Sequence, residues 1–298
     1  VLLRQLNGIN LFTLMNNNQL QKNGLITIEN FINSSNISKI NNELDSLFTK
    51  ESFNGGLFSI SPNRFLKTIH TPAKIKSLNL FEISIDIFKN YIEKNSNIKI
   101  SDYRLSNLEV FSEKGNYRPL FWHTDNRKGT LRAIIYLKGG KKKSGAFRYI
   151  FKTNNNPQSI EHKLSQKNLS MYKDQIHDCV YEAGTLIIFN PIGYHAKYPC
   201  IEERRAIFME FQDKNSNWPK NDYLISSSSL SHIVINNINF FQDFGSNNSL
   251  KSNASIYTEG KLTLPLNIII KLFVKRLLDI KNYKSLLSNI YYKFFVKI

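Results

Sequence analysis

The chain has 298 residues, enough to bury a substantial core in one large domain with room for an appendage. It has no run of about eighteen or more uncharged apolar residues, so no transmembrane helix is expected, and its opening residues lack the order of a signal peptide. The two cysteines, Cys179 and Cys200, argue against a disulfide framework and predict a cytoplasmic protein. The net charge of +17 would suit nucleic acid, an anionic membrane or an anionic substrate, although a chain rich in Asn, Lys and Ile equally predicts solvated lysines.

Composition divides the chain into an N-terminal extension (1–17), a domain (18–212), a Ser/Asn-rich linker or surface segment (213–260) and a basic helical tail (261–298). The domain opens with LITIENF, whose alternating apolar residues predict a strand. The helix ISKINNELDSLF follows, with Ser35 or Asn36 as a suitable N-cap. A second amphipathic helix is predicted over residues 79–95.

From about residue 103 to 212 the pattern changes to strands. They are RLSNLEVFSE, YRPLFWHTD, TLRAIIYLK, AFRYIFK, TLIIFN and RAIFMEFQ, and a polar insertion at roughly 153–178 interrupts the series. Short strands separated by turn residues predict a β-sandwich or barrel.

The stretch FWHTDNRKGT, residues 121–130, holds the first candidate site residues. His123 and Asp125 alternate along a predicted strand, so their side chains face the same way. A third ligand would complete a 2-His-1-carboxylate set, which is typical of non-haem Fe(II) oxygenases. An H-x-D pattern occurs often by chance, so the rest of the chain must support this interpretation.

Further downstream, EAGTLIIFNPIGYHAKYP places His195 just after a buried strand and a turn. Arg204 and Arg205 follow nine and ten residues later and open the strand RRAIFMEFQ. An arginine in an apolar strand is costly to bury without an anionic partner, and its planar fork suits a carboxylate. Adjacent strand residues face opposite ways, so only one of the two arginines can point inward.

The order H-x-D, then His after about seventy residues, then Arg after about ten, resembles the Fe(II)/2-oxoglutarate-dependent dioxygenases of the phytanoyl-CoA dioxygenase type. The resemblance covers residues 18–212. It includes QLQKNGLITIENFINSSNISKINNEL, FWHTD, LRAIIYLKGGKKKSGAFRYI, GTLIIFNPIGYHAKYP and RRAIFMEF. It implies a mainly β fold with flanking helices, a double-stranded β-helix (a cupin-like jelly roll), which agrees with the strands expected above.

The resemblance also implies roles for individual residues. His123, Asp125 and His195 match the iron ligands, and Arg204 best matches the arginine that holds the distal carboxylate of 2-oxoglutarate, with Arg205 as the alternative. It implies Fe(II), 2-oxoglutarate and O2 as cofactors, a small-molecule or lipid-linked substrate, and hydroxylation with release of succinate and CO2. Halogenation is disfavoured, because an iron-bound halide would take the place of the Asp125 carboxylate.

Two alternatives stay open. A metal-binding jelly roll without 2-oxoglutarate chemistry would leave the inward arginine unexplained. A nucleic-acid demethylase of the same superfamily would suit the positive charge, but RRAIFMEFQ lacks the further arginines usual there, so no specific nucleic-acid partner is expected. The segment FKTNNNPQS departs from the family's usual turn near the substrate mouth, which weakens any inference about the substrate.

The remaining candidates favour ordinary structural roles. His70, His162, His177 and His232 are expected to be hydrogen-bonded residues, Trp122 a core residue, and Lys141–Lys143 a solvated hairpin loop. From Leu264 to Ile298, apolar residues recur at helical spacing among seven basic residues and one acid. This pattern predicts a helix that docks on the domain or lies on an anionic membrane surface.

Overall fold

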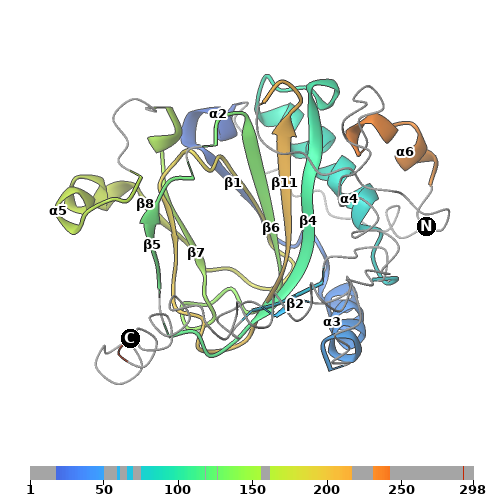
Figure 1. Ribbon diagram of the computed structural model, residues 1–298, viewed down its shortest axis with the longest axis horizontal. Helices are drawn as coiled ribbons and strands as arrows, with labels where there is room; N and C mark the ends of the chain where they lie inside the picture. Colours follow the sequence, from blue (N-terminus) through green and yellow to red (C-terminus); the bar gives the residue numbers. More distant parts are fainter. Residues whose placement is uncertain are drawn as a thin grey trace, which may run out of the picture.

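The computed structural model describes residues 18–49, 59–60, 66–69, 75–117, 119–125, 127–155, 162–216, 231–241 and 291. These residues form two antiparallel sheets that face each other (Figure 1). The larger has the order β1-β9-β6-β11-β4-β3-β2 and the smaller β5-β10-β7-β8. The predicted jelly roll is therefore confirmed. None of the described helices has the length and apolar character needed to cross a membrane.

The strands of the larger sheet are β1 (Leu25–Ile28), β2 (Ser59–Ile60), β3 (Leu66–Ile69), β4 (Tyr103–Glu113), β6 (Thr130–Lys138), β9 (Leu186–Phe189) and β11 (Arg204–Asp213). The strands of the smaller sheet are β5 (Leu120–His123), β7 (Phe147–Ile150), β8 (Ile176–Cys179) and β10 (His195–Lys197). Within the predicted series 103–212, the structure adds β8 and β10, both short. β8 occupies the end of the segment expected to be a polar insertion, and there it pairs with β7.

Alternation along the strands sorts apolar side chains to opposite faces of the larger sheet. Tyr136 and Ala206 lie between the two sheets, while their strand neighbours Ile135 and Ile207 join the core under the helices. Trp122 is buried as expected, but it belongs to a separate cluster with Ile150, Tyr194 and Ala196 on the smaller sheet. Both faces of the larger sheet are thus covered, and the space between the sheets is lined mainly by aromatic and aliphatic groups.

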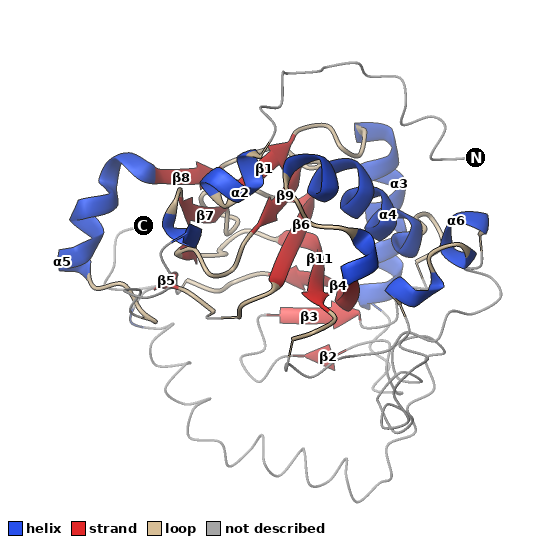
Figure 2. Cartoon of the chain, turned by 90° about the horizontal axis from the view of Figure 1, so that it is seen from above, coloured by secondary structure: helices blue, strands red, loops and turns tan. Residues whose placement is uncertain are grey.

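Helices α3 (Ser34–Thr49) and α4 (Leu80–Ile87) cover the outer face of the larger sheet, and Figure 2 shows them on one side of it. The N-cap of α3 is Asn33, so the prediction of Ser35 or Asn36 is wrong. The Asn33 side chain accepts the hydrogen bond from the Asn36 amide at 2.9 Å. The helix predicted over residues 79–95 is a regular α-helix only in α4. It continues as the π-helical turn η3 (Phe88–Ile92) and the 3-10 turn η4 (Glu93–Asn95).

The remaining helical segments are short. They are α2 (Gln19–Asn23), η5 (Ile100–Asp102), η6 (Thr153–Asn155), α5 (Gln166–Leu169), η7 (Ser170–Gln175), α6 (His232–Ile235) and η9 (Ile238–Phe240). Part of the predicted linker is packed rather than exposed. The ring centroids of Phe240 and Phe88 are 5.4 Å apart, and those of Phe241 and Phe81 are 5.3 Å apart. The extension 1–17 and, except for Tyr291, the basic tail lie outside the described residues.

Candidate metal centre

His123, Asp125 and His195 come together between the sheets. His123 ends β5 and His195 begins β10, and the two residues are directly paired across these antiparallel strands. One ligand atom of each of the three lies within 4.8 Å of the others. The Nε2 atoms of the two histidines are each 3.5 Å from an Asp125 carboxylate oxygen. In the part of the chain that the structure describes, these residues form the group of donors suited to hold a metal ion.

Both imidazoles present the same nitrogen to the centre. The Nδ1 atom of His123 lies 2.8 Å from the Phe121 carbonyl oxygen, and that of His195 lies 2.9 Å from the Gly193 carbonyl oxygen. Because a carbonyl oxygen only accepts, each Nδ1 carries the hydrogen, and a neutral ring then has its lone pair on Nε2. Such a partner on the second ring nitrogen is the usual way that a histidine ligand is oriented.

The turn between β9 and β10 fixes Asp125, which lies beyond the end of β5. The Asp125 amide donates to the Pro191 carbonyl at 3.0 Å, so the two loops are tied together. At Gly193 a Cβ atom would lie 1.9 Å from the Tyr149 hydroxyl oxygen. Glycine is therefore required here, because the turn passes directly against that buried ring.

Charge at the centre favours a cation. Burial raises the pKa of the Asp125 carboxyl, but contacts with His123 and His195 and the charge of Arg132 outweigh burial and hold this pKa well below its ordinary value. Burial lowers the pKa of His195, so that ring is neutral at neutral pH. A carboxylate and a neutral imidazole are the forms that bind metal ions.

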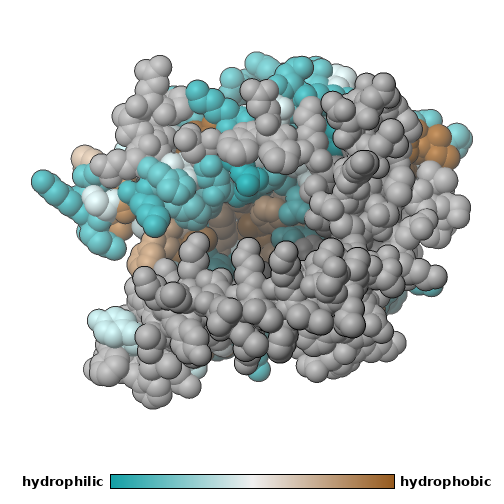
Figure 3. Space-filling model, in the orientation of Figure 1, coloured by the Kyte–Doolittle hydropathy of each residue, from teal (hydrophilic) through white to brown (hydrophobic). Residues whose placement is uncertain are grey.

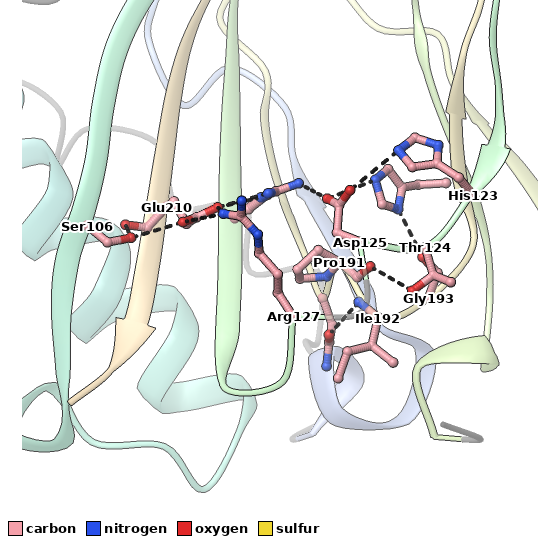
Figure 4. A network of polar contacts seen from close by, with 12 residues as sticks. Ser106, His123, Thr124, Asp125, Arg127, Pro191, Ile192, Gly193 and Glu210 are labelled. Carbon is pink, nitrogen blue, oxygen red and sulfur yellow. Dashed lines mark hydrogen bonds and ion pairs between the residues drawn. The ribbon is translucent and has the colours of Figure 1, made fainter. Parts of the chain in front are cut away.

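Sequence reasoning missed a charged network beside Asp125. Arg132, in β6, contacts the Asp125 carboxylate and also binds Glu210 of β11, with Nη2 at 2.9 Å from Oε2. The Oε1 atom of Glu210 also accepts hydrogen bonds from Nη1 of Arg127 at 3.3 Å and from the Ser106 hydroxyl at 3.2 Å (Figure 4). A signal for this network was available, because charged residues in the apolar strands TLRAIIYLK and RRAIFMEFQ need buried partners.

A second charged cluster lies further along the space between the sheets. Arg204 is buried, with Nη1 2.7 Å from the Gly145 carbonyl oxygen and Nη2 3.2 Å from the Glu113 carboxylate. Lys197 also binds Glu113, at 2.6 and 2.7 Å to its two oxygens. Burial raises the pKa of Glu113, but Lys197 and Arg204 outweigh it and lower that pKa. Two cations therefore share one carboxylate, and the Nε atom of Arg204 is buried without a hydrogen-bond partner.

Arg205 points to the other face of the larger sheet, under helix α3. Its Nη2 atom is 2.5 Å from Asp45 and its Nε atom 2.7 Å from Glu203. The structure thus separates the two adjacent arginines as strand geometry requires, and it is Arg204 that shares the space between the sheets with the histidines and Asp125.

In the described part of the chain, the group of metal donors does not include the other histidines or the cysteines. The His162 ring is 6.5 Å from the His123 ring, and the His177 ring stacks on Phe151. His70 lies outside the described residues. Burial raises the pKa of both Cys179 and Cys200, the latter to about 11, so neither thiol is ionised at neutral pH.

The centre lies near a recess with apolar walls. In the orientation of Figure 1, apolar surface is visible in this recess between β5 and β6 (Figure 3). Leu120 and Phe121, just before His123 in β5, are each 47% exposed. The described surface next to the centre therefore offers apolar contacts to a ligand.

The sequence matches no protein-family model and no curated protein at a significant level. The structure is similar to EctD from S. alaskensis, whose apoform has 14% sequence identity and a TM-score of 0.50, with 65% of this chain and 74% of that chain covered. The chain has the fold of EctD. EctD has also been solved with 2-oxoglutarate and 5-hydroxyectoine.

Two further structures have lower TM-scores. HygX from Streptomyces hygroscopicus, solved with nickel, 2-oxoglutarate and hygromycin B, has 11% identity and a TM-score of 0.46, with 71% of this chain and 92% of that chain covered. SnoN, a non-heme alpha ketoglutarate dependent epimerase from nogalamycin biosynthesis, has 14% identity and a TM-score of 0.47, with 65% and 79% covered.

Proposed function

We propose that this protein is an Fe(II)- and 2-oxoglutarate-dependent oxygenase that oxidises a small molecule, with hydroxylation as the outcome. One observation carries the proposal: the three donors of the metal centre and a buried cationic cluster lie on the same inner surface. His195 and Lys197 are two residues apart in β10 and face the same way, since they pair with Tyr149 and Phe147. Two residues span about 7 Å of a strand, a length that suits a five-carbon dicarboxylate.

The donor set fits iron. Two imidazole nitrogens and one carboxylate on one side of a metal ion match the non-haem Fe(II) triad and leave positions open for other ligands. His123 and His195 would bind through Nε2, and Asp125 through its carboxylate. When bound, iron and 2-oxoglutarate supply the activation of O2 and the conversion of the cosubstrate to succinate and CO2.

The second cluster fits the distal carboxylate of 2-oxoglutarate. The charges of Arg204, Lys197 and Glu113 sum to one net positive charge (two cations and one anion). One carboxylate would neutralise this charge, and the Nε–H of Arg204 is available as a donor. Lys197 is thus proposed as a second cosubstrate-binding residue beside Arg204, while Arg205 is not part of the site.

The aromatic walls would keep water away from the reacting groups. The Phe147 and Phe189 rings lie 5.9 and 5.4 Å from the His195 ring. The exposed Leu120 and Phe121 would contact the substrate at the mouth of the recess. Apolar groups at these positions favour a substrate with apolar surface, which agrees with a small molecule or a lipid-linked one.

Anaerobic addition of Fe(II) and then 2-oxoglutarate to the protein tests the proposal. The expected result is a weak visible charge-transfer absorption that needs both additions, and a screen for succinate release would then identify substrates. A protein that binds Fe(II) but shows no change on addition of 2-oxoglutarate would instead be a metal-binding jelly roll of another kind.

A further inference from the structure

Arg132 and Glu210 lie opposite each other on neighbouring strands, β6 and β11, in a directly paired register. Both face the space between the sheets, where their side chains are only 14% and 11% exposed. A buried charge pair of this kind is costly to build unless its geometry is good and its other atoms are also bonded. Both conditions are met here, and the additional partner of Arg132 is Asp125.

The guanidinium of Arg132 uses different atoms for its two carboxylate partners. Nε and Nη2 both lie 2.9 Å from the Oε2 atom of Glu210, while Nη1 contacts the Oδ2 atom of Asp125. Because the guanidinium is planar and rigid, the position of Glu210 fixes the direction in which Nη1 points. Figure 4 shows Asp125 between His123 on one side and this network, which ends at Glu210 and Ser106, on the other.

Glu210 is itself held in place. The Ser106 hydroxyl donates to its Oε1 atom at 3.2 Å, and the Nη1 atom of Arg127 lies 3.3 Å from both of its carboxylate oxygens. Glu210 also cancels the charge of Arg132, so the pair brings a directed hydrogen bond to Asp125 without adding net positive charge beside a cation. Arg127 is 41% exposed, and solvent screens its charge.

A metal-binding carboxylate can use one oxygen or both. An oxygen that accepts a charge-assisted hydrogen bond is a poorer metal ligand, which favours coordination through the other oxygen, Oδ1. We propose that Arg132, aligned by Glu210, restricts Asp125 to a single metal bond and thereby keeps one more coordination position open. This inference rests on the metal centre of the proposed function, and it makes Arg132 a positioning residue.

The number of open positions can be measured without turnover. Mn(II) bound to the protein relaxes the protons of exchanging water in proportion to the number of coordinated waters. The samples are the unaltered protein, Arg132→Met, Arg132→Lys and Arg127→Met, each saturated with Mn(II) and free of 2-oxoglutarate. Arg127→Met is the matched control, since Arg127 contacts the same Glu210 carboxylate from a position that is 41% exposed.

The expected relaxation enhancement is about one third lower in Arg132→Met, because a second carboxylate oxygen would replace one of three waters. The control should keep the unaltered value. The enhancement in Arg132→Lys should also be lower than that of the unaltered protein, since an ammonium retains the charge but cannot span both carboxylates. Mn(II) affinity is measured in the same titrations, so that all samples are compared with the metal site fully occupied.

An enhancement in Arg132→Met equal to that of the unaltered protein would overturn the inference while leaving the proposed function intact. A normal enhancement in Arg132→Lys would also overturn it, since charge alone would then suffice. If Arg132→Met does not fold, Glu210→Gln replaces it: a lowered enhancement supports the alignment by Glu210, and a normal one contradicts it. An unaltered protein that binds no Mn(II) would remove the metal centre and the proposed function with it.

Discussion

Arg204 and Arg205 are adjacent in the chain and lie on opposite faces of the larger sheet. Arg204 meets Glu113 between the sheets, and Arg205 meets Asp45 of helix α3. The register of β11 in the larger sheet therefore decides which arginine can reach a ligand between the sheets.

Arg204→Met should weaken 2-oxoglutarate binding by on the order of 2–5 kcal/mol, which is at least about 30-fold in Kd. Arg205→Met should leave this Kd within a few-fold, because Arg205 faces α3, although it should lower the stability of the fold. Titration of the Ni(II)-loaded proteins with 2-oxoglutarate measures both constants. The reverse pattern would show that Arg205 is the binding residue.

Replacing His123, Asp125 or His195 by Ala should abolish tight binding of Co(II) or Fe(II) and leave the jelly roll folded, because each residue supplies one of three donors. Metal titration with circular dichroism of each variant checks both parts. His162→Ala is the matched control, since its ring is close to His123 but lies outside the group of donors. Tight metal binding in any of the three variants would exclude that residue from the centre.

Glu113→Gln should destabilise the protein without cosubstrate by about 3–5 kcal/mol, because Lys197 and Arg204 would lose their shared counter-ion. 2-Oxoglutarate should then stabilise the variant more than the unaltered protein, since its distal carboxylate replaces the missing charge. Thermal unfolding of the Ni(II)-loaded proteins with 2-oxoglutarate, or with pyruvate in its place, measures this effect. Equal stabilisation by the two acids would contradict a distal-carboxylate site at this cluster.

Stability should depend on pH through Glu203, which binds Arg205, Lys138 and Ser112. Burial raises the pKa of Glu203, but hydrogen bonds from these three residues outweigh it and lower the pKa to about 2. A carboxyl whose pKa is lowered on folding stabilises the protein above its unfolded pKa, 4.5, and loses that stabilisation as the pH falls towards 2. Solvent screens part of this contribution, because the Lys138 side chain is 51% exposed, but the contribution at pH 7 should still be more than twice that at pH 3.

Urea unfolding of the unaltered protein and Glu203→Gln at the two pH values tests this dependence. The difference in the free energy of unfolding between the two proteins should be less than half as large at pH 3 as at pH 7. A difference independent of pH would mean that the ionised carboxylate does not provide the stabilisation.

The basic tail remains a prediction, because residues 264–298 lie outside the described structure apart from Tyr291. If it forms an amphipathic helix on a membrane, the full chain should float with anionic vesicles at low salt and be released at high salt. A chain ending at Gly260 should not float. If neither chain floats and the shortened chain aggregates, the tail packs on the domain instead.

The strand pattern of the sequence predicted a β-sandwich or barrel, and the resemblance to a known family narrowed this prediction to a jelly roll and named the candidate triad. Runs of apolar residues mark β6, β9 and β11 because both faces of the larger sheet are buried. The strand period does not place both donors, because β5 ends at His123 and Asp125 lies in the loop that follows. Two strands were not predicted. β8 (IHDC) has only one buried side chain and β10 has only three residues, and both are held by pairing with β7.

Tertiary structure alone decided the partners of the buried charges. The pairing of Arg132 with Glu210 and Asp125, and of Lys197 and Arg204 with Glu113, joins residues 7 to 91 positions apart. Nothing local selects such partners, because a buried charge can be compensated by any opposite charge that the sheets bring within reach. The sequence could show that these residues needed partners, but the register between strands decided which ones they have.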